Sequence, residues 1–318
     1  MKLYLVIPCY NEQEVLEETA KRTREKMRAL VECGKISEES KICFVDDGSK
    51  DLTWSIIDRL CTDDKAFCGI KLSRNRGHQN ALLAGLMAVK DYCDAAISLD
   101  ADLQDDIDAI DLMLEKYDEG CDVVYGVRSS RKTDKIFKRA TARAFYKIMR
   151  FMGVELVYDH ADYRLMSKRS LDELEEFKEV NLFLRGLVPL IGFKSAAVEY
   201  ERGSRFAGKS KYSLRKMVSF AFEGVTSMSI KPIRMISVLG FFIFLASIGM
   251  LSYSLVQHFS GNTIEGWTSI AVSVWAIGGL QLLAIGVIGE YIGKIYLETK
   301  QRPKYIIDEI KNLEKNGD

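Results

Sequence analysis

Two long stretches near the C-terminus contain no charged residue, and they limit what this chain can fold into. The first runs from Met235 to Val256 and has 22 residues, and the second runs from Gly266 to Gly289 and has 24. An α-helix needs about 20 apolar residues to cross a hydrocarbon layer about 30 Å thick. Each stretch is therefore long enough to span a membrane; the alternative is a helical hairpin buried in a soluble core.

The charges around these stretches favour membrane-spanning helices over a buried hairpin. Residues 257–267, which connect them, contain no lysine or arginine, whereas basic residues lie on both outer flanks: Arg215, Lys216, Lys231 and Arg234 before, and Lys294, Lys300, Arg302 and Lys304 after. Loops rich in Lys and Arg stay on the cytoplasmic side. We therefore expect a multi-pass membrane protein in which the N-terminal region and both termini are cytoplasmic.

The charge pattern divides the chain into four parts. Six basic residues and no acidic one lie between Arg202 and Phe222, as in an amphipathic helix on an anionic membrane surface; a solvated charged face is the alternative. The predicted parts are a cytosolic catalytic domain (1–204), a basic interface segment (205–232), a transmembrane hairpin (233–292, with spans at about 235–256 and 266–289) and a cytosolic tail (293–318).

Composition excludes two functional classes. The 45 Lys+Arg residues balance 45 Asp+Glu residues, whereas a dedicated nucleic-acid binder usually has a basic excess. The seven cysteines include no C-x-x-C pair, which indicates reduced thiols rather than disulfides or a zinc site. We therefore expect neither a nucleic-acid partner nor a structural zinc ion.

The N-terminal region alternates short apolar runs with helical patterns, which predicts an α/β fold with a mainly parallel sheet and helices on both faces. The apolar runs are Leu3–Ile7, Lys41–Val45, Cys68–Leu72, Ala95–Leu99 and Asp122–Tyr125, and the helical patterns lie near 12–33, 52–60, 80–92 and 106–119. Ligands on such sheets bind at the carboxyl ends of the strands. The polar clusters that follow the strands are therefore the candidate sites.

Acidic residues follow two of these strands. Asp46 and Asp47 could accept hydrogen bonds from a base or ribose, although a helix N-cap in the same turn is an alternative. Asp100 and Asp102 follow the fourth run, where strand alternation would aim both to one side, with Gln104 beside them. Such oxygen ligands suit Mg²⁺ or Mn²⁺ bridging to phosphates; an ordinary acidic surface turn is the alternative.

Two further clusters carry charge. Asp162 and Arg164 are two residues apart, and a structural ion pair is the plain alternative to a catalytic role. From Arg128 to Arg150 there are nine basic residues and one acidic residue, which suits an anionic ligand or a solvated helix face.

Several motifs in order resemble a known family. They are Val6-Ile-Pro-Cys-Tyr-Asn-Glu12, Val45-Asp-Asp-Gly-Ser-Lys-Asp51, Asp100-Ala-Asp-Leu-Gln104 and Ala161-Asp-Tyr-Arg-Leu-Met166, followed by Arg205-Phe-Ala-Gly-Lys-Ser-Lys-Tyr212 and Gly289-Glu-Tyr-Ile-Gly-Lys-Ile-Tyr296. Together they resemble the inverting glycosyltransferases of family 2, which have the nucleotide-diphospho-sugar transferase (GT-A) fold. The last two motifs resemble the polyprenyl-phosphate group, which includes bactoprenol glucosyl transferases and dolichol-phosphate mannose synthases.

The resemblance implies a role for each candidate residue. The nucleotide sugar would be held by Pro8, Tyr10, Glu12, Asp46 and Asp47; the Mg²⁺ or Mn²⁺ ion by Asp100, Asp102 and Gln104; and the acceptor phosphate by Arg128, Arg205, Ser210 and Lys211. Asp162 and Arg164 would lie at the reacting centre. Because the acceptor phosphate is already largely deprotonated at neutral pH, Asp162 need not act as a base.

The implied reaction is metal-dependent transfer of one sugar, with inversion, from UDP-glucose or UDP-N-acetylglucosamine to undecaprenyl phosphate at the inner (plasma) membrane, for cell-envelope glycans. Transfer from GDP-mannose, as in the dolichol-phosphate mannose synthases, is an alternative. A processive polysaccharide synthase is another, although the chain lacks the Q-x-x-R-W motif of that class. The resemblance also implies a homo-oligomer, a tetramer.

Overall fold

The computed structural model describes residues 1–128, 151–152, 160–201, 203, 225–227, 229–260 and 266–313. Arg205, Ser210 and Lys211 lie outside the described residues, as do most of the interface segment 205–232 and the basic run after Arg128.

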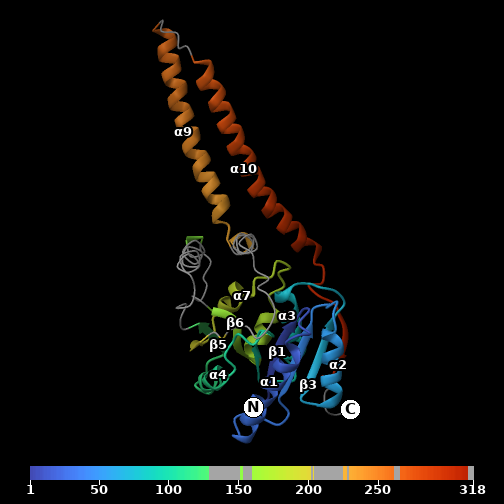
Figure 1. Ribbon diagram of the computed structural model, residues 1–318. Helices are drawn as coiled ribbons and strands as arrows, with labels where there is room; N and C mark the ends of the chain where they lie inside the picture. The colour runs from blue at the N-terminus through green and yellow to red at the C-terminus, as the bar shows by residue number, and fades with distance from the viewer. Residues whose placement is uncertain are drawn as a thin grey trace.

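An eight-stranded mixed sheet forms the centre of the head, in the order β7-β5-β6-β4-β1-β2-β3-β8 (Figure 1). The strands are β1 (Leu3–Cys9), β2 (Lys41–Asp46), β3 (Phe67–Leu72), β4 (Ala95–Ser98), β5 (Val123–Arg128), β6 (His160–Ser167), β7 (Ser195–Tyr200) and β8 (Ile307–Lys311). Strands β1 to β4 are parallel to one another, and β5 is parallel to β7, whereas β6 and β8 pair antiparallel with their neighbours. The α/β prediction of GT-A type is confirmed.

Helices connect the strands of the head. They are α1 (Leu16–Glu32), α2 (Thr53–Asp63), α3 (His78–Val89), α4 (Ala109–Asp118), α6 (Lys168–Glu175) and α7 (Leu184–Leu190). Helix α1 begins at Leu16, four residues after the predicted start near Glu12. The Glu12 amide donates to Thr53 Oγ1 at 2.9 Å, in the turn that precedes the helix.

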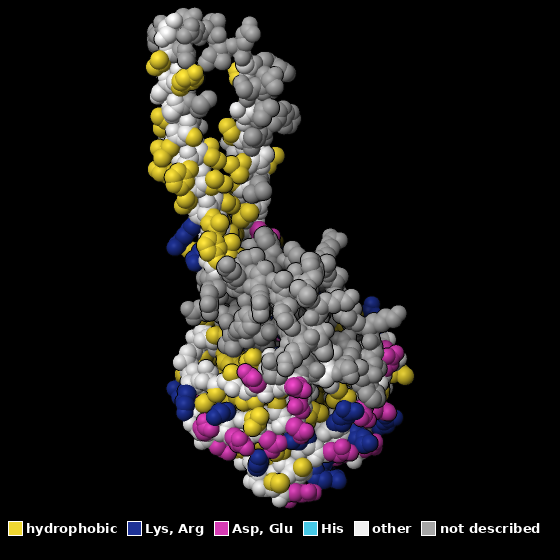
Figure 2. Space-filling view, turned by 60° about the vertical axis from the view of Figure 1, so that its left-hand side comes forward, with side chains coloured by type: hydrophobic (Ala, Val, Ile, Leu, Met, Phe, Trp, Pro, Cys, Tyr) yellow, Lys and Arg dark blue, Asp and Glu magenta, His cyan; other side chains and the backbone are white. Residues whose placement is uncertain are grey.

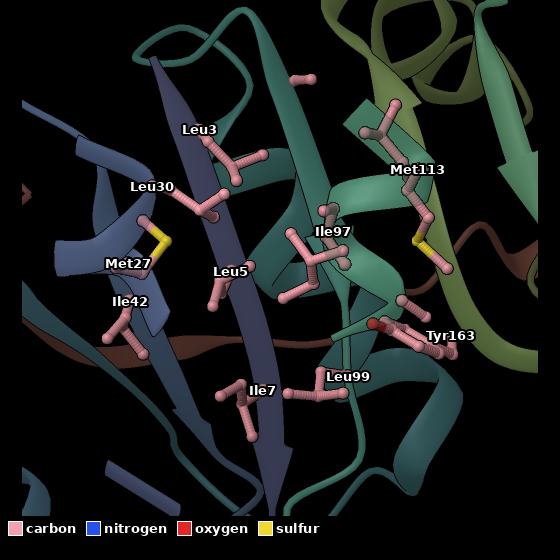
Figure 3. Close-up of a cluster of buried hydrophobic side chains, with 14 of the residues drawn as sticks. Leu3, Leu5, Ile7, Met27, Leu30, Ile42, Ile97, Leu99, Met113 and Tyr163 are labelled. Atoms are coloured by element: carbon pink, nitrogen blue, oxygen red, sulfur yellow. The ribbon is translucent and has the colours of Figure 1, made fainter. Parts of the chain in front are cut away.

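The sheet is covered by apolar side chains on both faces, which explains why its strands read as continuous apolar runs. One cluster packs α1 and α4 against alternate residues of β1 and β4, including Leu5 and Ile97 (Figure 3). The other packs α3 against the opposite face, where Val6 and Val45 lie. All seven cysteines are free, and six of them are buried in these layers.

Two long helices, α9 (Lys231–Phe259) and α10 (Trp267–Lys300), extend side by side away from the head (Figure 1). Their described side chains leave large apolar groups exposed, among them Phe242 at 62% and Leu282 at 72% (Figure 2). Within the described part of the chain, one segment, Ile277–Lys300, meets the length and hydropathy needed to cross a membrane. The two-span hairpin therefore stays a prediction.

After α10 the chain returns to the head. The turn at 301–306 leads into β8, which pairs antiparallel with β3, with Ile310 opposite Ile70. The C-terminal segment, predicted only as a cytosolic tail, thus supplies a strand of the catalytic sheet. This pairing fixes the C-terminal end of α10 to the head.

Candidate active site

The candidate residues gather at one edge of the sheet because β1, β2 and β4 run in the same direction. Cys9 lies opposite Asp46, and Val6 lies opposite Ser98, so the loops after these strands are neighbours. This edge is where an α/β sheet binds its ligands.

Asp100 and Asp102 lie on a turn and not on a strand, since β4 ends at Ser98. Strand alternation is therefore the wrong reason for their shared side. The turn is tight: Leu103 has a φ of 56°, and the Asp102 carboxylate accepts a hydrogen bond from the Gln104 amide at 3.2 Å. Burial, with Asp162 and Asp102 nearby, raises the pKa of the Asp100 carboxyl.

Strand β6 brings Asp162 to the same edge. Because β6 runs antiparallel to β4, with Arg164 opposite Ser98, its first residues lie beyond the carboxyl end of β4. The Ser98 hydroxyl donates to the Asp162 carbonyl and fixes this register. His78, the first residue of α3, lies between the two acidic groups, with Nε2 at 3.7 Å from Asp100 Oδ1 and from Asp162 Oδ2.

The Asp162 carboxylate is held by two arginines. Arg164 Nη2 donates to Oδ1 at 3.0 Å, while Arg185 donates from Nε to Oδ1 at 3.1 Å and from Nη2 to Oδ2 at 3.0 Å. Burial alone would raise the pKa of Asp162, but the charges of Arg185 and Arg164 hold it far below its ordinary value. Asp162 is therefore an ionised, oriented carboxylate.

The side chains of Arg164 and Arg185 differ in their exposure to solvent. The Arg164 side chain is only 1% exposed, whereas that of Arg185 is 31% exposed. The Asp162–Arg164 ion pair is thus present, as the plain alternative expected, and Arg164 acts from inside the protein. Arg185, on α7, is partly exposed to solvent, and sequence reasoning missed it.

Asp46 is the last residue of β2 and Asp47 directly follows the strand. Both residues are buried, and burial raises the pKa of both carboxyls. Asp46 accepts from the Ser49 amide, at 3.3 Å to Oδ1 and 3.2 Å to Oδ2. Asp47 accepts from the amides of Arg76 at 2.6 Å and Gly77 at 2.9 Å. Asp47 thus joins the loop after β2 to the loop after β3.

The residues predicted to bind the nucleoside lie at the end of β1 and in the loop that follows it. Pro8 is buried within β1, opposite Val45, and Tyr10 and Glu12 follow in the partly exposed turn. Asn11, between them, has a φ of 52° and accepts from the Lys50 amide at 2.9 Å. This bond couples the loop after β1 to the loop after β2 beside Asp46.

A second polar group lies across β5 and β7. Asp105 accepts from the Tyr200 hydroxyl, and Arg128 Nε donates to the same hydroxyl at 3.4 Å. Burial, together with the nearby Asp100 charge, raises the pKa of Asp105 to about 6. Of the four residues predicted to bind acceptor phosphate, Arg128 is the one within the described residues, and its side chain is 24% exposed.

The turn that carries Asp100 and Asp102, called the acidic turn below, fits a divalent cation. No group of three or more His, Cys, Asp or Glu residues in the described ranges could hold a metal ion, so the protein would offer two carboxylates, Asp100 and Asp102. Mg²⁺ is commonly held by one or two carboxylates plus water and substrate phosphates. A cation there would also offset the crowding of negative charge around Asp100.

Comparison with known proteins identifies the family. Residues 4–175 match the model of glycosyl transferase family 2. The uncharacterised glycosyltransferase YkoT of Bacillus subtilis is 55% identical over 306 residues, covering 96% of this chain and 91% of YkoT. The bactoprenol glucosyl transferase of Shigella phage SfV is 40% identical over 312 residues, covering 96% of this chain and 98% of the phage protein.

Among solved structures, a mannosyltransferase from Pyrobaculum calidifontis aligns over 93% of this chain and 84% of its own length, with 15% identity and a TM-score of 0.49. The family match spans the strands and turns that carry Asp46, Asp100 and Asp162, and the identity to YkoT extends over almost the whole chain. The chain is a glycosyltransferase and belongs to glycosyltransferase family 2.

Proposed function

We propose that this glycosyltransferase moves one sugar, with inversion, from a nucleotide-diphospho-sugar to a polyprenyl phosphate at the cytoplasmic face of the plasma membrane. UDP-glucose or UDP-N-acetylglucosamine is the proposed donor, and undecaprenyl phosphate is the proposed acceptor. The observation that carries the proposal is that two long helices with exposed apolar side chains extend from the head that carries Asp100 and Asp102, and that α10 is joined to the sheet through β8. The similarity to a bactoprenol glucosyl transferase over nearly the full chain supports the same acceptor class.

In this proposal the donor is held by the loops after β1, β2 and β4. Asp46 and the 8–12 loop contact the nucleoside, while Asp100 and Asp102, with Gln104 beside them, hold Mg²⁺ or Mn²⁺. An ion held there would supply positive charge to offset that of the departing nucleoside diphosphate. Asp47 keeps the adjoining loops in register through its bonds to Arg76 and Gly77.

The acceptor needs orientation more than deprotonation. A phosphate monoester has a second pKa of about 6 and is mostly a dianion at neutral pH. The depressed pKa of Asp162 makes it a poor proton acceptor, which fits a role in holding Arg185 and a sugar hydroxyl. Arg128, together with Arg205, Ser210 and Lys211, is the proposed acceptor-phosphate group, because guanidinium groups bind phosphate oxygens bidentately.

The membrane arrangement remains part of the proposal. In this arrangement residues 1–204, together with strand β8 of the C-terminal segment 293–318, form the catalytic domain. Residues 205–232 are the interface segment, and 233–292 are a hairpin that crosses the bilayer twice. The exposed apolar groups of α9 and α10 support this division, because water-exposed helices rarely carry so many of them. A tetramer is proposed from the family resemblance alone.

Two other reactions remain candidates. Transfer from GDP-mannose would use the same acidic turn and differ in the contacts to the base. A processive synthase would add many sugars to one acceptor, and the missing Q-x-x-R-W motif speaks against it.

The test is a transfer assay with purified full-length protein in lipid nanodiscs. Undecaprenyl phosphate is supplied with UDP-glucose, UDP-N-acetylglucosamine or GDP-mannose, and products are analysed by mass spectrometry and by NMR of the anomeric proton. A β-linked lipid with one sugar supports the proposal. An α-linked product, a polymer, or transfer only to a soluble acceptor would contradict it.

A further inference from the structure

The carboxylate of Glu298 makes an unusual set of contacts at the end of α10. It accepts hydrogen bonds from the Val180 amide at 2.8 Å, from the Asn181 amide at 2.8 Å and from Asn181 Nδ2 at 2.7 Å. Carboxylates that bind backbone amides in this way fix a loop firmly, because each bond is assisted by charge. The last turn of the long apolar helix therefore holds residues 180–181 of the head.

The fixed residues lead directly into the helix that carries Arg185. Three residues after Asn181, α7 begins at Leu184, whose amide donates to Gln79 Oε1 at 2.8 Å. The Leu184 carbonyl accepts from Arg164 Nη1 at 3.4 Å. The first turn of α7 is thus held by α3, by β6 and, through the preceding loop, by α10. That turn presents Arg185 to Asp162.

We propose that Glu298 is a positioning residue for sugar transfer, which acts through the 180–183 loop to place Arg185 against Asp162. The inference rests on the proposed function for the reaction that is assayed, and on the hydrogen-bond chain for the mechanism. It connects the orientation of α10 to the geometry of the reacting centre. A shift of about 1 Å in a positioning group can slow an enzyme by about 100-fold.

A second contact provides a matched control. Lys304 Nζ donates to the Phe177 carbonyl at 2.8 Å, so it joins the same C-terminal segment to the same loop, but at a point seven residues before α7. If the segment only anchors the tail, loss of Lys304 and loss of Glu298 should have similar effects. If Glu298 positions Arg185, its loss should be the more harmful for turnover.

The experiment compares Glu298→Ala, Glu298→Gln and Lys304→Ala in the full-length protein in nanodiscs. We expect Glu298→Ala to lower kcat by about tenfold while donor KM stays within about twofold, which is the pattern of a misplaced reacting group. Glu298→Gln keeps one acceptor oxygen but loses the charge and one of the two acceptors, so its rate should lie between that of Glu298→Ala and that of wild type. Lys304→Ala should stay within about twofold of wild type in kcat.

Two further measurements separate positioning from simple stabilisation. In an Arg185→Ala background, Glu298→Ala should cause no additional loss in single-turnover rate, because both changes would affect one unit. Hydrogen exchange of the amides of residues 185–188 and 190 should become faster in Glu298→Ala than in Lys304→Ala, and this readout needs no substrate.

Three outcomes would contradict the proposal. Rate losses that add in the double variant, equal effects of Glu298→Ala and Lys304→Ala, or unchanged exchange in α7 would overturn the positioning role. If wild-type protein transfers sugar to no polyprenyl phosphate, the proposed function fails, and the exchange measurement still decides whether Glu298 controls α7.

Discussion

Arg185 donates two hydrogen bonds, of 3.1 Å and 3.0 Å, to the carboxylate of Asp162, although the two residues are 23 positions apart in the chain. The pair joins α7 to β6 at the carboxyl edge of the sheet. Because Arg164 also donates to Asp162, the carboxylate stays ionised and fixed in direction. Its geometry suits alignment of a substrate better than removal of a proton.

Replacing Arg185 by lysine should therefore impair the reaction. Lysine supplies a point charge in place of a planar fork, so it cannot make both bonds to Asp162. We expect Arg185→Lys to lower kcat about 10-fold and Arg185→Ala about 100-fold. Donor affinity, titrated without acceptor, should change less than about threefold. Wild-type kcat in Arg185→Lys would contradict the bidentate role.

The same ion pairs predict how stability depends on pH. The pKa of Asp162 is lower in the folded protein than in the unfolded chain, so ionised Asp162 stabilises the fold above its unfolded pKa of about 3.9. This contribution is lost as the pH falls below about 4, through the depressed folded value. Between pH 7 and pH 3, Tm should fall more for wild type than for Asp162→Asn, measured by scanning fluorimetry. Parallel Tm curves would contradict this.

Loss of one carboxylate from the acidic turn should abolish most activity without unfolding the head. We expect Asp102→Asn to reduce turnover by at least about 100-fold, since the metal would lose one of its two carboxylate ligands. EDTA should reduce the turnover of wild type to a similar extent, and added Mn²⁺ should restore that turnover. Circular dichroism checks that the fold is intact. Full activity of Asp102→Asn in Mn²⁺ would refute the assignment.

Asp47 should matter for stability as well as for donor binding. Asp47→Ala leaves the half-buried amides of Arg76 and Gly77 without their acceptor. A fully buried unsatisfied group costs about 1–3 kcal/mol, so we expect a total loss of about 1–3 kcal/mol from the two partly exposed amides. The nearby Gly48, with a φ of 64°, packs so closely on the Arg74 backbone that the loops have little room to adjust. Urea unfolding measures the loss. Asp63→Ala, at an exposed position at the end of α2, is the control and should change stability by less than about 0.5 kcal/mol.

The positions of Lys and Arg predict the membrane topology. A reporter fused after Asp318 should be cytoplasmic, and one inserted near Gly261 should be external, because only the outer flanks of the two apolar stretches are basic. Paired alkaline phosphatase and green fluorescent protein fusions distinguish the two sides. A cytoplasmic reporter at Gly261 would exclude a hairpin that crosses twice.

The first five strands could be predicted because each is a short apolar run buried on both faces. Their positions agree with the structure to within a few residues, and so does the edge at which Asp46 and Asp100 lie. Local patterns were sufficient, since parallel β-α-β units place successive strand ends together.

The antiparallel strands were missed, because their partners are distant in sequence. Strand β6 pairs with β4 across more than 60 residues, and only this pairing brings Asp162 beside Asp100. Strand β8 follows a long apolar helix and alternates exposed and half-buried residues, as a surface tail would.

Arg185 belongs to no motif that the sequence analysis used. Its one local sign is a single charged residue inside the apolar run Leu182–Leu187. A lone arginine in such a run needs a partner when the run is buried, yet the sequence gives no means of identifying Asp162 as that partner.

The pairing of β8 with β3 has a practical consequence for protein production. A truncated chain that ends at residue 204 would leave β3, whose residues are nearly all buried, as an open strand edge. Unpaired edges of this kind recruit other chains and promote aggregation. In the full-length protein the outer strand is β8, where Asp308, Glu309 and Lys311 place charge along the edge. Soluble versions for crystallisation should therefore retain residues 301–313 through a short linker in place of the long helices.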